Sequence, residues 1–247
     1  HKTGGYFEST VNEEVFRHLN NTFNKWYSNS NCPPERRVPN LQKLAFPKLT
    51  YKRTKTLDKI YSLDKSSSIR VSIDMAQPHC IKEVIEKKKK SSMNIVYPSA
   101  KWDLRISASI ENVVPKPIGQ IVSSIRAKDR ISYQFDCFTI DISSIHTYSE
   151  GLTKEFIDEI IHKFQNKIPL PVDRSHGTIR TYEVEFEILD QKYLQKARKL
   201  MAEKGKQSME FQQLSYFFMQ DAIQLVELAS NTSYVPAVCR MPEPSKK

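Results

Sequence analysis

Residues 181–188 read Thr-Tyr-Glu-Val-Glu-Phe-Glu-Ile, an alternation of acidic side chains with apolar and aromatic ones. In an extended strand, Glu183, Glu185 and Glu187 point to one face and the apolar side chains point to the other. Neighbouring carboxylates lie ~6.7 Å apart along such a strand and, at an effective dielectric of about 20, repel each other by roughly 2–3 kcal/mol. Water, facing cations or a bound metal can neutralise this stripe, and the segment alone does not decide among them.

The same two-faced alternation recurs in four other segments, with mixed charges on the polar face. They are residues 69–74, 102–111, 128–133 and 138–143. Alternation of this length is typical of antiparallel strands with one apolar and one polar face. The polar faces combine Arg, Lys, Asp and Glu with small Ser residues, which leaves space between the charges. This favours a closed barrel with a charged interior over an open sheet.

Four further segments place apolar residues at helical spacing, and two stretches have the composition of connections. The helices are predicted at 11–27, 152–165, 191–204 and 208–228, and the connections at 28–40 and 112–125. At 247 residues the chain is long enough for one large domain with a sizeable core. We therefore expect a single β-dominated α+β domain over residues 1–247.

The composition narrows the range of functions. A net charge of +10 and a sequence pI ≈ 9.3 suit a polyanionic partner. No apolar run approaches the ~20 residues of a membrane span, so no membrane partner is expected. Only 6 Gly residues occur and none lies in a phosphate-cradling loop, which excludes P-loop and Rossmann mechanisms.

An acidic strand face that meets cationic strand faces suggests a hard, oxygen-ligated metal ion beside an anion site. Carboxylate oxygens select Mg²⁺ or Mn²⁺ over soft metals. Arg and Lys stabilise charge on a transferring phosphoryl group, and one carboxylate can orient or deprotonate the attacking water. The same charges could instead form salt bridges inside the barrel without catalytic use, and the residue pattern leaves both interpretations open.

Four motifs in order carry a resemblance to a known family. They are Val-Ile-Glu-Lys (84–87), Trp-Asp-Leu-Arg-Ile-Ser-Ala-Ser (102–109), Ala-Lys-Asp-Arg-Ile-Ser-Tyr (127–133) and Glu-Val-Glu-Phe-Glu-Ile (183–188). In this order the chain resembles the fungal-type metal-dependent RNA 5′-triphosphatases, mRNA capping enzymes of the triphosphate tunnel metalloenzyme group. The similarity runs from about residue 50 to 190.

The resemblance implies an eight-stranded antiparallel closed barrel with flanking helices, whose tunnel holds the triphosphate end of RNA and a divalent metal, Mg²⁺ or Mn²⁺. The reaction would remove the γ-phosphate of 5′-triphosphate RNA, the first step of mRNA cap formation. By position, Glu187 matches the direct metal ligand, and Glu183 and Glu185 match carboxylates that act around metal-bound water. The remaining matches divide into γ-phosphate-gripping residues (Arg70, Lys128, Arg130), further tunnel-lining positions with catalytic roles (Lys87, Glu111, Asp141), another tunnel position (Asp58) and a small hydroxyl residue (Ser143).

Two departures from the family pattern stand out. The chain has Thr139 where the family has an Arg two residues before the aspartate, which removes one expected cation. The family's first motif, a strand with two metal-binding glutamates at spacing two, has no match and would lie upstream of about residue 6. Glu13 and Glu14 are adjacent in a predicted helix and cannot substitute. We therefore expect that the sequence lacks its native N-terminal segment and first barrel strand, and that it holds metal weakly.

The resemblance also implies a nuclear location, a homodimer, and two partners: a guanylyltransferase and the transcription machinery, through a phosphorylated polymerase tail or an elongation factor. Two other functions fit the same residues. One is a non-catalytic basic barrel that binds RNA ends or phosphorylated protein tails. The other is a phosphatase for inorganic tripolyphosphate or nucleoside triphosphates, which substrate competition would distinguish.

Overall fold

The computed structural model describes residues 7, 10–30, 49–64, 67–77, 80–96, 102–135, 138–172, 174–188, 191–204 and 209–230. Seven strands form one antiparallel sheet in the order β4-β3-β2-β1-β5-β6-β7. The strands are β1 (Thr50–Ser62), β2 (Ser67–Asp74), β3 (Ile81–Ile95), β4 (Leu104–Val113), β5 (Ser124–Phe135), β6 (Phe138–Tyr148) and β7 (Ile179–Ile188). The helices are α1 (Glu13–Ser30), α2 (Lys154–Gln165), the 3-10 turn η3 (Arg174–His176), α3 (Gln191–Lys204) and α4 (Met209–Ser230).

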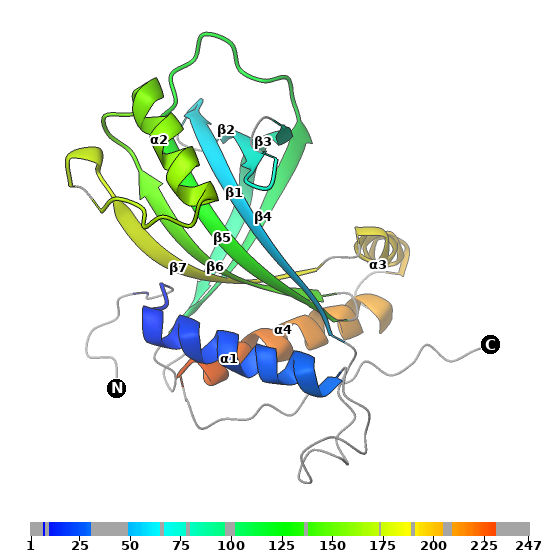
Figure 1. The fold of residues 1–247 in the computed structure, drawn as a ribbon. Coiled ribbons are helices and arrows are strands. Elements are labelled where there is room, and N and C mark those ends of the chain that lie inside the picture. Colours follow the sequence, from blue (N-terminus) through cyan, green and yellow to red (C-terminus); the bar gives the residue numbers. More distant parts are fainter. Residues whose placement is uncertain are drawn as a thin grey trace.

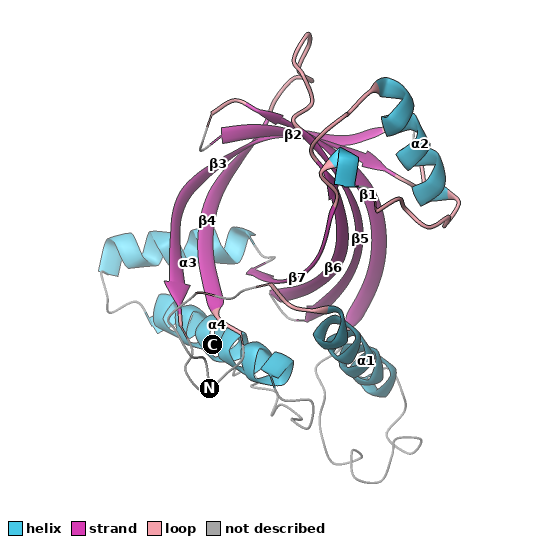
Figure 2. Ribbon diagram, turned by 90° about the vertical axis from the view of Figure 1, so that its left-hand side faces the viewer, coloured by secondary structure: helices cyan, strands magenta, loops and turns pink. Residues whose placement is uncertain are grey.

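The sheet curls into an arc around a central space (Figure 2). β4 and β7 are its two edges and lie at the two ends of this arc. Twist is inherent in long strands, and irregularities in the β2–β3 and β3–β4 pairings, near Ser72 and Lys89, add local bending. The β-dominated antiparallel fold with few helices is therefore confirmed. The described part of the chain contains seven strands of the predicted eight and forms a half-barrel.

Helices α1 and α2 lie on the convex side of the arc (Figure 1). Polar side chains line the concave side. α1 packs Leu19 and Phe23 against Tyr133 and Ile142, all of them buried. Farther along the convex face, Ile160 of α2 lies in a second cluster with residues of β1 and β5. Full burial of one such side chain contributes roughly 1.5–3 kcal/mol. α4 contributes Leu214 and Phe218 to a third cluster beside β6 and β7.

The local signals explain the helix boundaries. The Thr153 hydroxyl accepts a hydrogen bond from the Phe156 amide and caps α2. The predicted connection at 28–40 is wrong at its start, because α1 continues to Ser30, and residues 31–40 lie outside the described part. The connection predicted at 112–125 is shorter than expected, since β4 extends to Val113 and β5 begins at Ser124. None of the described helices combines the length and apolarity needed to cross a membrane.

Candidate active site

The concave face of the arc encloses a polar cavity of about 230 Å³. Its lining comes from strands far apart in sequence: Thr54, Thr56, Asp58, Arg70, Ser72, Lys82, Glu83, Lys87, Glu111, Arg126, Lys128, Arg130, Glu185 and Glu187. Strand pairing accounts for this convergence. Arg130 is paired with Ser143, and Ser143 with Glu183, so one face of three adjacent strands collects these side chains. Of the eleven predicted site residues, eight line this cavity and the other three lie beside it.

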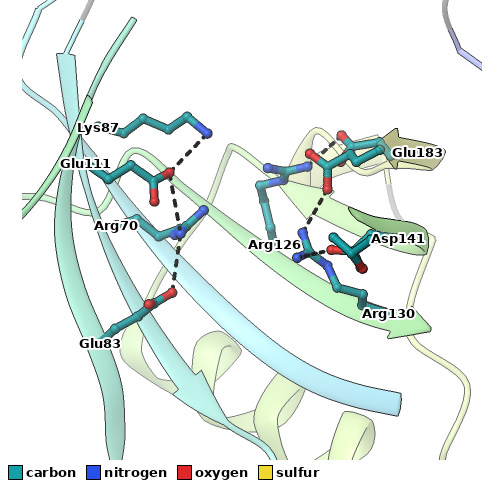
Figure 3. Close-up of polar contacts among 10 residues, drawn as sticks. Arg70, Glu83, Lys87, Glu111, Arg126, Arg130, Asp141 and Glu183 are labelled. Atoms are coloured by element: carbon teal, nitrogen blue, oxygen red, sulfur yellow. Dashed lines mark hydrogen bonds and ion pairs between the residues drawn. The ribbon is translucent and has the colours of Figure 1, made fainter. Parts of the chain in front are cut away.

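One wall of the cavity is a network of short ion pairs on β5, β6 and β7 (Figure 3). Arg130 contacts both Asp141 at 2.5 Å and Glu185 at 2.8 Å. Arg126 contacts Glu183 at 2.7 Å. Asp141 is almost fully buried, so Arg130 compensates a carboxylate that water barely reaches. The wall therefore presents cations already positioned by carboxylates.

The opposite wall is formed by β2, β3 and β4 and is held more loosely. Arg70 lies 3.3 Å from Glu83 and 4.0 Å from Glu111. Lys87 lies 3.2 Å from the same Glu111 carboxylate. Lys87 belongs to the run Lys87–Lys90, which lies within β3 and not at a strand end or loop. Cations from both walls thus face one space.

Lys128 occupies the centre of the cationic strand and is buried. Burial lowers the pKa of its ammonium group, the neighbouring Arg130 and Arg126 lower it further, and Glu185 and Glu183 oppose this effect. The three cations of β5, Arg126, Lys128 and Arg130, are two residues apart and repel each other unless anions lie among them. This strand is therefore suited to a ligand with several negative charges.

Glu185 and Glu187 differ in their electrostatic environment. Burial alone would raise the pKa of Glu185, but the surrounding Lys128, Arg130 and Lys87 outweigh it and the pKa is lowered. The pKa of Glu187 is raised, first by desolvation and then by the nearby Glu185 and Asp141 carboxylates. Glu187 makes no ion pair with any described residue. It is the carboxylate with most to gain from an added cation.

The carboxylates of this cavity could supply only some of the ligands of a hard metal ion. Glu187 offers an uncompensated carboxylate, whereas Glu185 and Asp141 are both occupied by Arg130. Within the described ranges, no group of three His, Cys, Asp or Glu residues is placed to hold a metal ion. Thr139 stands opposite Glu187 in the β6–β7 pairing, and its hydroxyl donates to Asp141 at 3.3 Å. The absent arginine therefore leaves Glu187 without a direct cationic partner on the adjacent strand.

Asp58 and Ser143 are buried on the same concave face. Asp58 Oδ1, Ser143 Oγ, Arg70 Nε and Arg130 Nε have no hydrogen-bond partner among the described residues. Buried polar atoms are nearly always hydrogen-bonded in folded proteins. Their clustering around one cavity indicates a site that binds polar ligands.

Six residues that line this cavity were not predicted, and two of them, Arg126 and Glu83, form ion pairs with predicted residues. Arg126 has the same strand parity as Lys128 and Arg130, so extending the alternation by one step would have found it. Glu83 lies four residues before Lys87 on β3, with the same parity. Nothing in the sequence pairs Arg126 with Glu183 or Glu83 with Arg70, because strand order decides those contacts.

A curved antiparallel sheet whose concave face mixes Arg and Lys with carboxylates defines a class of β proteins that bind polyanionic, phosphate-type ligands inside an arc of strands. Residues 1–229 match the family model described as "mRNA capping enzyme, beta chain". The chain belongs to this family, and the resemblance to the fungal-type RNA 5′-triphosphatases is confirmed.

Individual relatives are distant. The chain is 25% identical over 225 residues to the mRNA-capping enzyme subunit beta of Cryptococcus neoformans, covering 90% of this chain and 47% of the relative. It is 29% identical over 140 residues to the mRNA-capping enzyme subunit beta of Schizosaccharomyces pombe, covering 56% of this chain and 42% of the relative. The chain thus spans about half the length of the curated relatives it matches.

The fold is similar to that of a solved structure, the S. pombe Pct1 RNA triphosphatase in complex with the Spt5 CTD. The TM-score is 0.65 at 23% sequence identity, covering 90% of this chain and 71% of that chain. The structure of the same triphosphatase without this ligand gives the same values. At this identity the similarity concerns the fold.

Proposed function

We propose that this chain forms the catalytic domain of a metal-dependent RNA 5′-triphosphatase, which hydrolyses the γ-phosphate of 5′-triphosphate RNA in the first step of mRNA cap formation. One observation carries the proposal: cations and carboxylates from separate strands converge in a single polar cavity. Family membership supports the same activity.

Each group in the cavity has a role that its surroundings support. Arg70, Lys128 and Arg130 grip the γ-phosphate and stabilise the charge that spreads over its oxygens during transfer. Glu183 and Glu185 orient the attacking water and accept its proton. Lys87, Glu111 and Asp141 hold these side chains in position through the ion pairs described above, and Asp58 and Ser143 supply further polar atoms.

Glu187 would hold a divalent metal, Mg²⁺ or Mn²⁺, because it is the uncompensated carboxylate of β7. When bound, such an ion neutralises charge on the phosphate oxygens. A complete coordination shell needs carboxylates beyond those that β7 offers, since Arg130 occupies Glu185 and Asp141.

We propose that an eighth strand completes the barrel as part of the same single domain. Among the described residues, the arc ends at the edge strands β4 and β7, and the single pairing beyond them is the bridge from Val11 to Tyr182 of β7. A second cavity of about 480 Å³ extends along these edges, with Ile106 and Phe186 on the strands and Leu225 and Val226 on α4. A strand placed there would satisfy both edges, direct apolar side chains to α4 and direct alternate side chains to the metal.

The partners follow from the family. A guanylyltransferase would receive the diphosphate-ended RNA, and a link to the transcription machinery is supported by the complex of Pct1 with the Spt5 CTD. Nuclear location and homodimerisation belong to the same proposal.

The decisive test is phosphate release from triphosphate-ended RNA by the full-length protein that contains this chain. Mg²⁺ or Mn²⁺ should be required, and Glu187→Ala should lower kcat/KM at least ~100-fold. The matched control is Glu86→Ala, a carboxylate that pairs with Lys88 on the other face of β3 and should leave turnover within about two-fold. Undiminished release by Glu187→Ala, or release in excess chelator, would refute the assignment.

Hydrolysis of inorganic tripolyphosphate or nucleoside triphosphates is the second candidate. No aromatic side chain among the described residues lines the polar cavity, so nothing there reads a base by stacking. The cavity recognises the phosphates alone, and competition between tripolyphosphate and triphosphate RNA measures how much the rest of the RNA contributes. A basic barrel that only binds RNA ends would show binding without phosphate release.

A further inference from the structure

The space on the concave face of the arc is open at two ends, which differ in charge. We call them the Arg105 end, which includes Arg126 and continues past Lys87 to Arg105, and the Glu187 end, which includes Glu83 and continues past Arg130 to Glu187. Strand register defines them: Lys87 is paired with Glu111, and the next residue on the same face, Lys89, is paired with Ser109. Continuing along β4, the concave positions are Ser107 and then Arg105. Along β3, Lys89 therefore lies roughly 7 Å from Lys87. Along β4, Arg105 lies roughly 20 Å from Glu111.

Arg105 is held in place at its end of the groove. Its Nε donates a hydrogen bond to Asn94 Oδ1 at 2.9 Å, and its guanidinium lies over the Phe7 ring at 4.6 Å from the centroid. A fixed guanidinium on the same strand and face as the cavity residue Glu111 is well suited to contact a phosphodiester that leaves the cavity.

The charges at the two ends have opposite balance. At the Arg105 end lie three cations and two carboxylates: Lys89, Arg105, Arg126, Asp103 and Glu183. At the Glu187 end, the concave positions hold two cations and three carboxylates: Lys52, Lys82, Asp74, Glu83 and Glu187. Asp74 faces inward because it is paired with Thr56, which lines the polar cavity. A single-stranded polyanion is favoured at the first end and opposed at the second.

We infer that the RNA chain leaves the polar cavity over the Arg105 end, with the γ-phosphate directed to the Glu187 end. The inference rests on the proposed function, since it assumes that the triphosphate occupies the polar cavity. In this orientation Arg70, Lys128 and Arg130 hold the γ-phosphate. The α- and β-phosphates then lie toward Arg126, and the following phosphodiesters pass Lys89 and Arg105.

The test is the binding of a 3′-labelled, 5′-triphosphate RNA of twelve nucleotides, measured by fluorescence anisotropy over a range of salt concentrations. Lys89→Ala and Arg105→Ala should each weaken RNA affinity roughly three- to ten-fold and reduce the slope of log affinity against log salt by about 0.7, the value for one lost phosphate contact on a single strand. Lys52→Ala is the matched control: an exposed lysine on the concave face of β1 at the Glu187 end. It should change RNA affinity by less than about two-fold.

Inorganic tripolyphosphate, used as competitor, separates RNA contacts from cavity contacts. Its affinity should change much less than that of RNA in Lys89→Ala and Arg105→Ala. Arg105→Lys should retain most of the RNA affinity if the charge matters, whereas a purely structural role of Arg105 beside Phe7 and Asn94 would not be rescued.

The opposite pattern overturns the inference. If Lys52→Ala weakens RNA binding while Lys89→Ala and Arg105→Ala do not, the RNA leaves over the Glu187 end. Equal effects of all three on RNA would also refute a preferred end. A wild-type protein that binds the RNA with the expected pattern but releases no phosphate would refute the proposed activity and still support this polarity.

Discussion

The two walls of the arc carry the same kinds of charged residue but hold them differently. On the β5–β6–β7 wall, the Arg130 and Arg126 ion pairs measure 2.5–2.8 Å, and the Asp141 side chain is 5% exposed. On the β2–β3–β4 wall, the Arg70 and Lys87 contacts measure 3.2–4.0 Å, and the Glu111 side chain is 43% exposed. The first wall has the shorter ion pairs and one almost fully buried carboxylate, whereas the carboxylates of the second wall, Glu83 and Glu111, are 42% and 43% exposed.

The convex side of each wall explains this difference. Behind β5 and β6 lie buried Tyr133 and Ile142, packed in one cluster with α1. Behind β3 and β4, Met93 is 55% exposed and Ile110 is 46% exposed. A helix packed against a strand fixes the backbone that positions the charges, and an uncovered strand does not. Preorganised cations therefore belong to the wall with the hydrophobic core.

The largest expected effect tests the packing behind each wall. Phe23→Ala removes a buried ring from the α1 interface and should cost about 3–5 kcal/mol of unfolding free energy. Met93→Ala on the uncovered wall should cost less than about 0.5 kcal/mol. Urea unfolding of both variants measures the difference. Similar losses in the two variants would contradict the proposed contrast.

A smaller effect tests the ion pairs themselves. Arg130→Ala leaves the buried Asp141 carboxylate without its cationic partner and should cost about 3 kcal/mol. Arg53→Ala is the control, because Arg53 of β1 pairs with Asp129 at 2.7 Å on the convex face of β5 but is 55% exposed. It should cost less than about 1 kcal/mol. An Arg130→Ala variant as stable as Arg53→Ala would show that the buried network contributes little.

The smallest effect tests the two glutamates through the pH dependence of stability. The lowered pKa of Glu185 contributes stability that is present above its unfolded-state pKa and is lost as pH falls through the folded-state pKa. The raised pKa of Glu187 acts in the opposite direction: its contribution is present below the unfolded-state pKa and is lost as pH rises through the folded-state pKa.

In metal-free protein, Glu185→Gln should therefore flatten the acid side of a plot of Tm against pH. Glu187→Gln should raise Tm near neutral pH by the equivalent of less than about 1 kcal/mol, because it removes a desolvated charge and its repulsion from Glu185 and Asp141. Identical pH profiles for the two variants would contradict the difference in their environments.

The alternation of side chains along each strand was enough to predict which candidate site residues share a face. The alternation around Glu185 assigned all three glutamates to one face, and the same rule assigned Lys128 and Arg130. The rule fails at Lys90, where the β3–β4 register shifts and one residue is left without a partner. It also cannot reveal that Glu111 lies between Arg70 and Lys87, since that contact depends on the curvature of the sheet.

The order of side chains along each strand determined which residues face inward, since successive side chains of a strand point to opposite sides whatever the neighbouring strand is. Tertiary structure alone decided which carboxylate meets which cation. Arg126 and Glu183 are 57 residues apart and meet because β6 lies between their strands with a particular register. Parity is a local property of the backbone, whereas pairing is set by strand order, register and curvature, which depend on the packing of the whole domain.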